Sequence, residues 1–186
     1  ILIWVVIWVL ALLFVIFWIE SYNKMITLEE NVYASWSQVE NQYQRRMDLV
    51  PNLVATVEWY TSHEKETLES VVNARSSALK INVNIENTDE LIEFNKSQGD
   101  LTQALSKLMM LTEDYPDLKA DQLFIKLQVS LEWAENRIAT ERMRYNEAVR
   151  KFNIFIKKFP MNTLSSIFKK NDKALFKASE GAIKPP

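Results

Sequence analysis

The chain has 186 residues but only two glycines, five prolines, one histidine and no cysteine. The glycines, Gly99 and Gly181, are too few for a phosphate-cradling loop, a dinucleotide-binding turn or a series of tight hairpins. Without cysteine the chain forms no disulfide and has no thiol nucleophile. A chain so poor in turn-forming residues spends most of its length in helix, which predicts an all-α fold.

The single histidine, His63, restricts metal chemistry. A di-iron site in a helical bundle takes two Glu-x-x-His pairs, and the metalloprotease helix takes two histidines. No serine lies in a glycine-framed turn, and no second histidine is present to act as a base. We therefore predict no catalytic, metal-binding or cofactor-binding residues and interpret His63 as a surface or boundary residue. An enzyme without a recognisable motif is left open as a minor alternative.

The longest apolar run, residues 1–19, contains no charge, glycine or proline. About 20 such residues span a hydrocarbon core of ~30 Å, so the run predicts one transmembrane helix. A buried core helix would keep a polar face, and a cleaved signal peptide would have a shorter run and a small-residue cleavage site. The aromatic side chains expected in the membrane are those of Trp4, Trp8, Phe14, Phe17 and Trp18.

Charge is unevenly distributed along the chain. The formal net charge of −2 gives no electrostatic reason to expect nucleic acid as a partner. In residues 160–186, five lysines stand against Asp172 and Glu180, which makes the tail +3 and leaves −5 for residues 20–159. A basic tail beside a bilayer either touches anionic lipid, at about 1 kcal/mol per lysine, or is solvated, and we favour solvation.

Apolar residues continue at helical spacing beyond the first run, so the anchor and the first soluble helix are predicted to form one rod. Pro51 is predicted to end that helix and begin the next. Residues 81–85 are expected to form a loop, Asn87 to cap the third helix, and Asp117 or Asp121 to cap the fourth. The predicted helices cover residues 20–47, 51–80, 88–115 and 121–159. Together they predict an antiparallel four-helix bundle at residues 20–159, between a transmembrane helix at 1–19 and a basic tail at 160–186.

Several polar residues lie on or beside the apolar stripes. Glu64, Arg137 and Asn146 are expected to pair across helices, for instance Glu64 with Arg137, and so to fix the register of the bundle. The alternative is a polar groove that recognises a partner. Because arginine forks clamp carboxylates and phosphates, the place expected for such docking lies beside Pro51. Its candidate residues are Tyr43, Arg45, Arg46 and Asn52.

Three blocks of sequence are more specific than any helical pattern. They read Trp-Ser-Gln-Val-Glu-Asn-Gln-Tyr-Gln-Arg-Arg at 36–46, Asp-Leu-Val-Pro-Asn-Leu-Val at 48–54, and Tyr-Pro-Asp-Leu-Lys-Ala at 115–120 followed by Arg-Tyr-Asn-Glu-Ala-Val-Arg at 144–150. In these blocks the chain resembles the LemA family of membrane-anchored bacterial proteins. The resemblance covers nearly the whole chain and departs mainly at residues 81–88 and in the tail. It implies an N-terminal anchor, a long antiparallel helical domain and the bacterial plasma membrane, and it implies no reaction.

These observations predict a non-catalytic, single-pass membrane protein that acts as a scaffold or oligomerising module. The expected partners are the lipid bilayer and either further copies of the chain or other membrane proteins, with no nucleic acid and no small-molecule substrate. The alternative is an adaptor or regulator of a membrane quality-control protease or an envelope-stress pathway, which would change the turnover of membrane proteins. The side of the membrane is left open, because Lys24 and Glu20 offset one another beside the apolar run.

Overall fold

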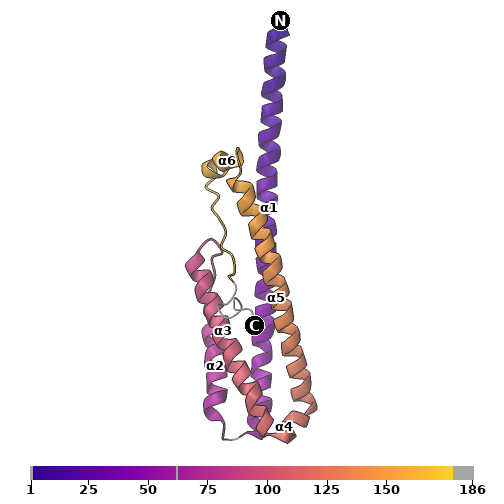
Figure 1. The fold of residues 1–186 in the computed structure, drawn as a ribbon, viewed down its shortest axis with the longest axis vertical. Coiled ribbons are helices and arrows are strands. Elements are labelled where there is room, and N and C mark those ends of the chain that lie inside the picture. Colours follow the sequence, from indigo (N-terminus) through magenta and orange to yellow (C-terminus); the bar gives the residue numbers. More distant parts are fainter. Residues whose placement is uncertain (1, 62, 178–186) are drawn as a thin grey trace, which may run out of the picture.

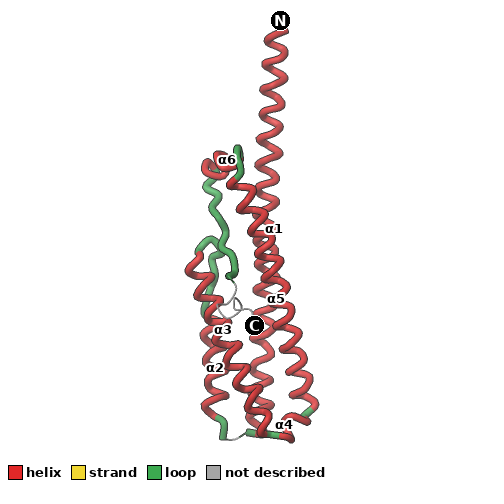
Figure 2. Tube along the Cα trace, viewed as in Figure 1, coloured by secondary structure: helices red, strands yellow, loops and turns green. Residues whose placement is uncertain are grey.

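A computed structural model describes residues 2–61 and 63–177. This part of the chain is all-α and contains no strand (Figure 2). Its elements are α1 (Leu2–Tyr60), α2 (Lys65–Leu79), α3 (Thr88–Leu111), the 3-10 helix η1 (Thr112–Asp114), α4 (Pro116–Ala120), α5 (Gln122–Lys157) and α6 (Met161–Ile167). The prediction of an all-α fold that begins with one long apolar helix is confirmed.

Helices α1 and α5 form a long antiparallel pair (Figure 1). At one end the hydroxyl of Tyr60 donates to the carboxylate of Asp121 at 3.0 Å. At the other end the Nζ atom of Lys24 lies 5.6 Å from the centre of the Phe155 ring. Helices α2 and α3 pack on one another as a hairpin beside the end of the pair that is farther from the N-terminus, and the first part of α1 projects alone beyond all other helices (Figure 1).

Pro51 lies inside α1 and does not end it, so the predicted boundary between helices 20–47 and 51–80 is wrong. The buried stripe of α1 passes Pro51 without a change of phase, through Val50 and Leu53, while Pro51 itself is exposed. Continued burial on both sides of the proline therefore outweighs its intrinsic cost of about 3 kcal/mol in a helix.

A contact from α2 compensates for the hydrogen bond that Pro51 removes. Proline has no N–H, so the carbonyl oxygen of Met47, four residues earlier, loses its helical donor. The Nε atom of Arg75 donates to that oxygen at 2.8 Å. The carbonyl thus keeps a partner, and α1 stays helical as far as Tyr60.

The remaining boundaries follow local capping signals. Asn87 Oδ1 accepts from the backbone N–H groups of Asp89 and Glu90, at 3.0 and 3.5 Å, and its side-chain amide donates to Glu90 at 2.8 Å. Asp121 accepts from the backbone N–H of Phe124 at 2.8 Å. Both predicted caps are confirmed, with Asp121 as the residue that caps α5. The predicted helix 88–115 ends early, because α3 stops at Leu111 and residues 112–114 form η1.

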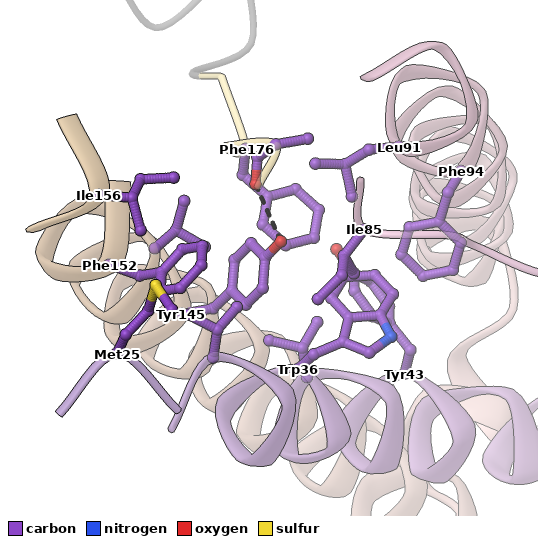
Figure 3. Close-up of a cluster of buried hydrophobic side chains, with 14 of the residues drawn as sticks. Met25, Trp36, Tyr43, Ile85, Leu91, Phe94, Tyr145, Phe152, Ile156 and Phe176 are labelled. Carbon is purple, nitrogen blue, oxygen red and sulfur yellow. Dashed lines mark hydrogen bonds between the residues drawn. The ribbon is translucent and has the colours of Figure 1, made fainter. Parts of the chain in front are cut away.

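The core consists of two apolar clusters stacked along the helices. The anchor-side cluster joins α1, α5, α6 and the C-terminal segment to Ile85, Leu91 and Phe94 in α3 and the loop before it. Its aromatic rings meet around Trp36 and Tyr145 (Figure 3). The Trp36 ring stacks on Phe176 at 5.8 Å and meets the edge of Tyr145 at 5.4 Å. The distal cluster joins the second half of α1 to α2, α3, α4 and the start of α5. The two clusters therefore connect the α1–α5 pair to the hairpin along its length.

The N-terminal part of α1 is exposed in this structure. The side chains of Trp4, Trp8, Phe14 and Phe17 are exposed, and only Trp18 packs partly against the anchor-side cluster. Among the described residues, α1 is the one helix long and apolar enough to span a membrane. Its apolar run is not packed inside the protein, which is the opposite of what a buried core helix would show.

Candidate functional site

A layer of polar side chains separates the two apolar clusters. Its centre is Arg46, whose side chain is 2% exposed. Its Nη1 atom donates to Glu135 at 2.5 Å and to the hydroxyl of Thr102 at 2.8 Å. Its Nη2 atom donates to the side-chain and backbone oxygens of Gln98 at 2.5 and 3.2 Å. One guanidinium group therefore links α1, α3 and α5 in a single register.

A pocket of about 440 Å³ opens at this layer, between α1, α3 and α5. Polar side chains dominate its lining, which consists of Tyr43, Arg46, Asn95, Gln98, Gly99, Thr102, Gln103, Glu135, Ile138 and Arg142. Burial raises the pKa of the Tyr43 phenol, and the nearby Arg142 and Arg46 only partly oppose that effect. The phenol is therefore neutral near pH 7 and is not available there as a general base.

The four residues predicted to dock a partner do not form one surface. Tyr43 and Arg46 are buried, whereas Arg45 and Asn52 are exposed. The prediction of a docking site around all four is wrong, because successive residues of a helix point in different directions. Arg46 does pair with a carboxylate, through Nη1 alone, but that carboxylate belongs to Glu135 of the same chain.

The predicted pair of Glu64 and Arg137 is also wrong. Glu64 lies just before α2 rather than inside a helix, and its carboxylate accepts from the hydroxyl of Tyr115 at 3.1 Å. Arg137 is exposed on α5. The error follows from Pro51, because the predicted second helix placed Glu64 on a stripe that does not exist. Asn146, the third residue of that set, forms hydrogen bonds with the backbone of Phe176 in the C-terminal tail.

The segment after α6 folds back along α5, and residues 170–177 are called the C-terminal strap. Asn146 holds the backbone of Phe176 through two hydrogen bonds of 3.0 and 2.9 Å. Asn153 holds the backbone of Lys173 in the same way, at 2.9 and 3.0 Å. The two asparagines are two helical turns apart and so lie on one face of α5. Each side-chain amide donates to and accepts from the strap backbone, as the backbone of an adjacent β-strand would.

The strap places a lysine in the interior. The side chain of Lys173 is 0% exposed, and its ammonium group donates to Glu86, to Glu29 at 3.1 Å and to the hydroxyl of Tyr33 at 3.3 Å. Lys170 pairs with the second oxygen of Glu29 at 2.5 Å. These contacts tie the strap to α1 and to the loop between α2 and α3. The expectation of a merely solvated basic tail is therefore wrong for residues 170–177.

The ion pairs shift both partners toward their charged forms. Burial alone would raise the pKa of Glu29, but hydrogen bonds from Lys170 and Lys173 outweigh burial and lower it. Burial alone would lower the pKa of Lys173, but the hydrogen bonds to Glu86 and Glu29 raise it. Both groups are therefore charged across the neutral range, and the strap is held by opposite charges there.

We expect the docked strap to detach in acid. The lowered pKa of Glu29 contributes stability above its ordinary value of 4.5, and that contribution is lost as the pH falls through the lowered value. The raised pKa of Lys173 contributes stability below 10.5, which is lost only in strong alkali. A nitroxide attached at Leu175→Cys should give a broad EPR spectrum at pH 7 that sharpens as the pH falls below 4.5, through the lowered pKa of Glu29. Glu29→Gln should sharpen the spectrum already at pH 7 and flatten its acid dependence, and an unchanged acid dependence would contradict the assignment.

The outer side of α5 carries an apolar stripe, which we call the outer stripe. Its residues Ile125, Val129 and Trp133 follow one another at four-residue spacing and are 39%, 46% and 68% exposed. They lie opposite the face that α5 buries through Phe124 and Leu131. This surface was not predicted from the sequence, because the outer stripe has three residues and the opposite, buried face of α5 carries a much longer apolar pattern.

Comparison with known proteins identifies the family of this chain. Residues 35–186 match the LemA family. The chain belongs to the LemA family. Among the described residues of this LemA protein, no group of three or more His, Asp or Glu side chains is arranged to hold a metal ion.

Relatives of this LemA protein include two named proteins from different bacteria. It is 28% identical over 165 residues to magnetosome protein MamQ 2 of Paramagnetospirillum magneticum, an alignment that covers 78% of this chain. It is 26% identical over 158 residues to protein LemA of Metamycoplasma hominis, covering 85% of this chain and 69% of that protein. The alignment spans 61% of the length of MamQ 2.

Proposed function

We propose that this LemA protein is a non-catalytic scaffold, anchored in the bacterial plasma membrane by residues 2–19 of α1, that associates with further copies of itself through the outer stripe. The observation that carries the proposal is the exposure of Trp133, Val129 and Ile125 on the outer side of α5. A monomer rarely leaves adjacent large apolar side chains in water, and aromatic residues of this kind supply much of the energy of protein interfaces.

Two further features support a binding role. The apolar run of α1 is exposed, so its burial needs a bilayer or an equivalent apolar environment. The domain is held in one register by the buried Arg46 layer, so it presents the outer stripe on a rigid surface. A rigid surface loses little conformational entropy on association, which favours binding.

The lack of cysteine allows a direct test by disulfide formation. Val129→Cys, reconstituted as the full chain in lipid vesicles and oxidised mildly, should give a disulfide-linked dimer. The matched control is Lys107→Cys, which places an exposed cysteine on α3. We expect at least a tenfold higher yield of dimer from residue 129, and equal yields from the two positions would overturn the proposal. Trp133→Glu, added to Val129→Cys, should lower the yield toward that of the control.

A further inference from the structure

A second exposed apolar surface lies beside the base of the proposed anchor. The turn after α5 and the helix α6 lie next to α1 just below its projecting part (Figure 1). The ring of Phe168, at the end of α6, packs on the ring of Tyr22 at a centroid distance of 4.7 Å. The end of α5 reaches the same level, since Phe155 lies under Lys24. We call residues 157–169 the apical turn.

The position of Tyr22 fixes the height of the apical turn relative to the bilayer. The apolar run ends at Ile19, and three further residues of helix advance by only ~5 Å. The interfacial layer on each side of the hydrocarbon core is about 5–8 Å thick. With the apolar run spanning the core, Phe168 therefore lies at the depth of the lipid headgroups.

The chemistry of the apical turn matches that layer. Phe159 is 86% exposed, Ile167 is 65% exposed and Phe168 is 45% exposed, whereas Met161 and Leu164 hold α6 on the anchor-side cluster. Exposed lysines flank the apolar side chains, at positions 158 and 169. Apolar side chains beside lysines are typical of protein segments that lie in the interface of an anionic membrane.

We infer that the apical turn inserts Phe159 and Ile167 into the headgroup region of the bilayer that α1 spans, with Lys158 and Lys169 against anionic lipid. This inference rests on the proposed membrane anchor. The apical turn forms a second attachment point beside the first, so it fixes the rotation of the domain about the axis of α1. A single helix leaves that rotation free.

Depth-dependent fluorescence quenching tests the inference in the full chain. The environment-sensitive probe NBD is attached to Ile167→Cys, and the protein is reconstituted in vesicles of phosphatidylcholine and phosphatidylglycerol at 7:3. Lipids with a nitroxide near the headgroup should quench this probe at least twofold more than the same probe at Lys107→Cys. A probe at Leu12→Cys should be quenched by nitroxides in the middle of the acyl chains.

The outcomes separate the inference from the proposed anchor. If residue 12 is quenched and residue 167 behaves like residue 107, the inference is overturned and the anchor stands. If residue 12 is not quenched, the proposed anchor is wrong and the inference falls with it. Weak quenching at residue 167 that rises only when the protein is diluted in lipid would mean that a second copy covers the apical turn, which also overturns the inference.

The charge requirement is tested by a matched pair of variants. Lys158→Gln together with Lys169→Gln should at least halve the quenching at residue 167 in vesicles with phosphatidylglycerol. Lys151→Gln, on an exposed lysine farther from the anchor along α5, should leave it unchanged. An equal loss from the two variants would contradict the role of the apical lysines.

Discussion

Replacing Arg46 with alanine is expected to lower the free energy of unfolding by about 3 kcal/mol, because it removes the cation to which Gln98, Thr102 and Glu135 are all hydrogen-bonded. Gln98 is buried, and it would lose the donor that both of its oxygens accept from. Alanine would also leave a cavity between the two apolar clusters. For a domain of this size the loss corresponds to a fall in Tm of about 6–12 °C, measured by circular dichroism in detergent micelles.

The neighbouring arginine provides the control for this experiment. Arg45 is exposed, so Arg45→Ala should change the Tm by no more than about 2 °C. Arg46→Lys should fall between the two, because an ammonium group cannot form the fork that reaches Gln98, Thr102 and Glu135 together. Equal effects of Arg45→Ala and Arg46→Ala would show that the polar layer does not stabilise the fold.

Replacing Lys173 with alanine is expected to release the C-terminal strap and lower the free energy of unfolding by about 2–4 kcal/mol. The carboxylate of Glu29 would then stay buried with Lys170 as its remaining cation. Release of the strap would also uncover Trp36, on which Phe176 stacks. Proteolysis at the strap, followed by mass spectrometry, should become at least tenfold faster than in the unmodified protein.

Two further variants separate the charge of Lys173 from its packing. Lys177→Ala removes an exposed lysine from the same strap and should leave the rate of proteolysis unchanged. Glu29→Met combined with Lys173→Met removes both buried charges and should recover part of the lost stability, because an apolar pair needs no desolvation of ions. If the double variant is less stable than Lys173→Ala, the strap depends on the charges themselves.

The features that were predicted correctly from the sequence depend on residues that lie close together in the chain. The caps at Asn87 and Asp121 act over two or three residues, and both are present in the structure. The apolar run of α1 and the long period of α5 are likewise local patterns. The helix boundary at Pro51 was predicted wrongly because the carbonyl of Met47 is satisfied by Arg75, which lies 28 residues after Met47 in sequence.

The polar residues were recognised as important, but most were assigned the wrong neighbours. Arg46 meets Glu135 across 89 residues of sequence, and Lys173 meets Glu86 across 87. No spacing rule connects such pairs. The pair of asparagines on α5 is different, since Asn146 and Asn153 repeat after seven residues and therefore share one face of the helix. That spacing is the local signal in the sequence for a segment that covers this face of α5.

The continuity of α1 through Pro51 has a mechanical consequence. With the proposed anchor in the bilayer, residues 20–60 form a stiff lever arm that extends about 60 Å from the membrane surface. Transmembrane helices tilt by about 20° on average, and over that length such a tilt moves the far end of the domain sideways by ~20 Å. A change in bilayer thickness would therefore be amplified into a large sweep of Trp59 and its surroundings, with no hinge in α1 to absorb it.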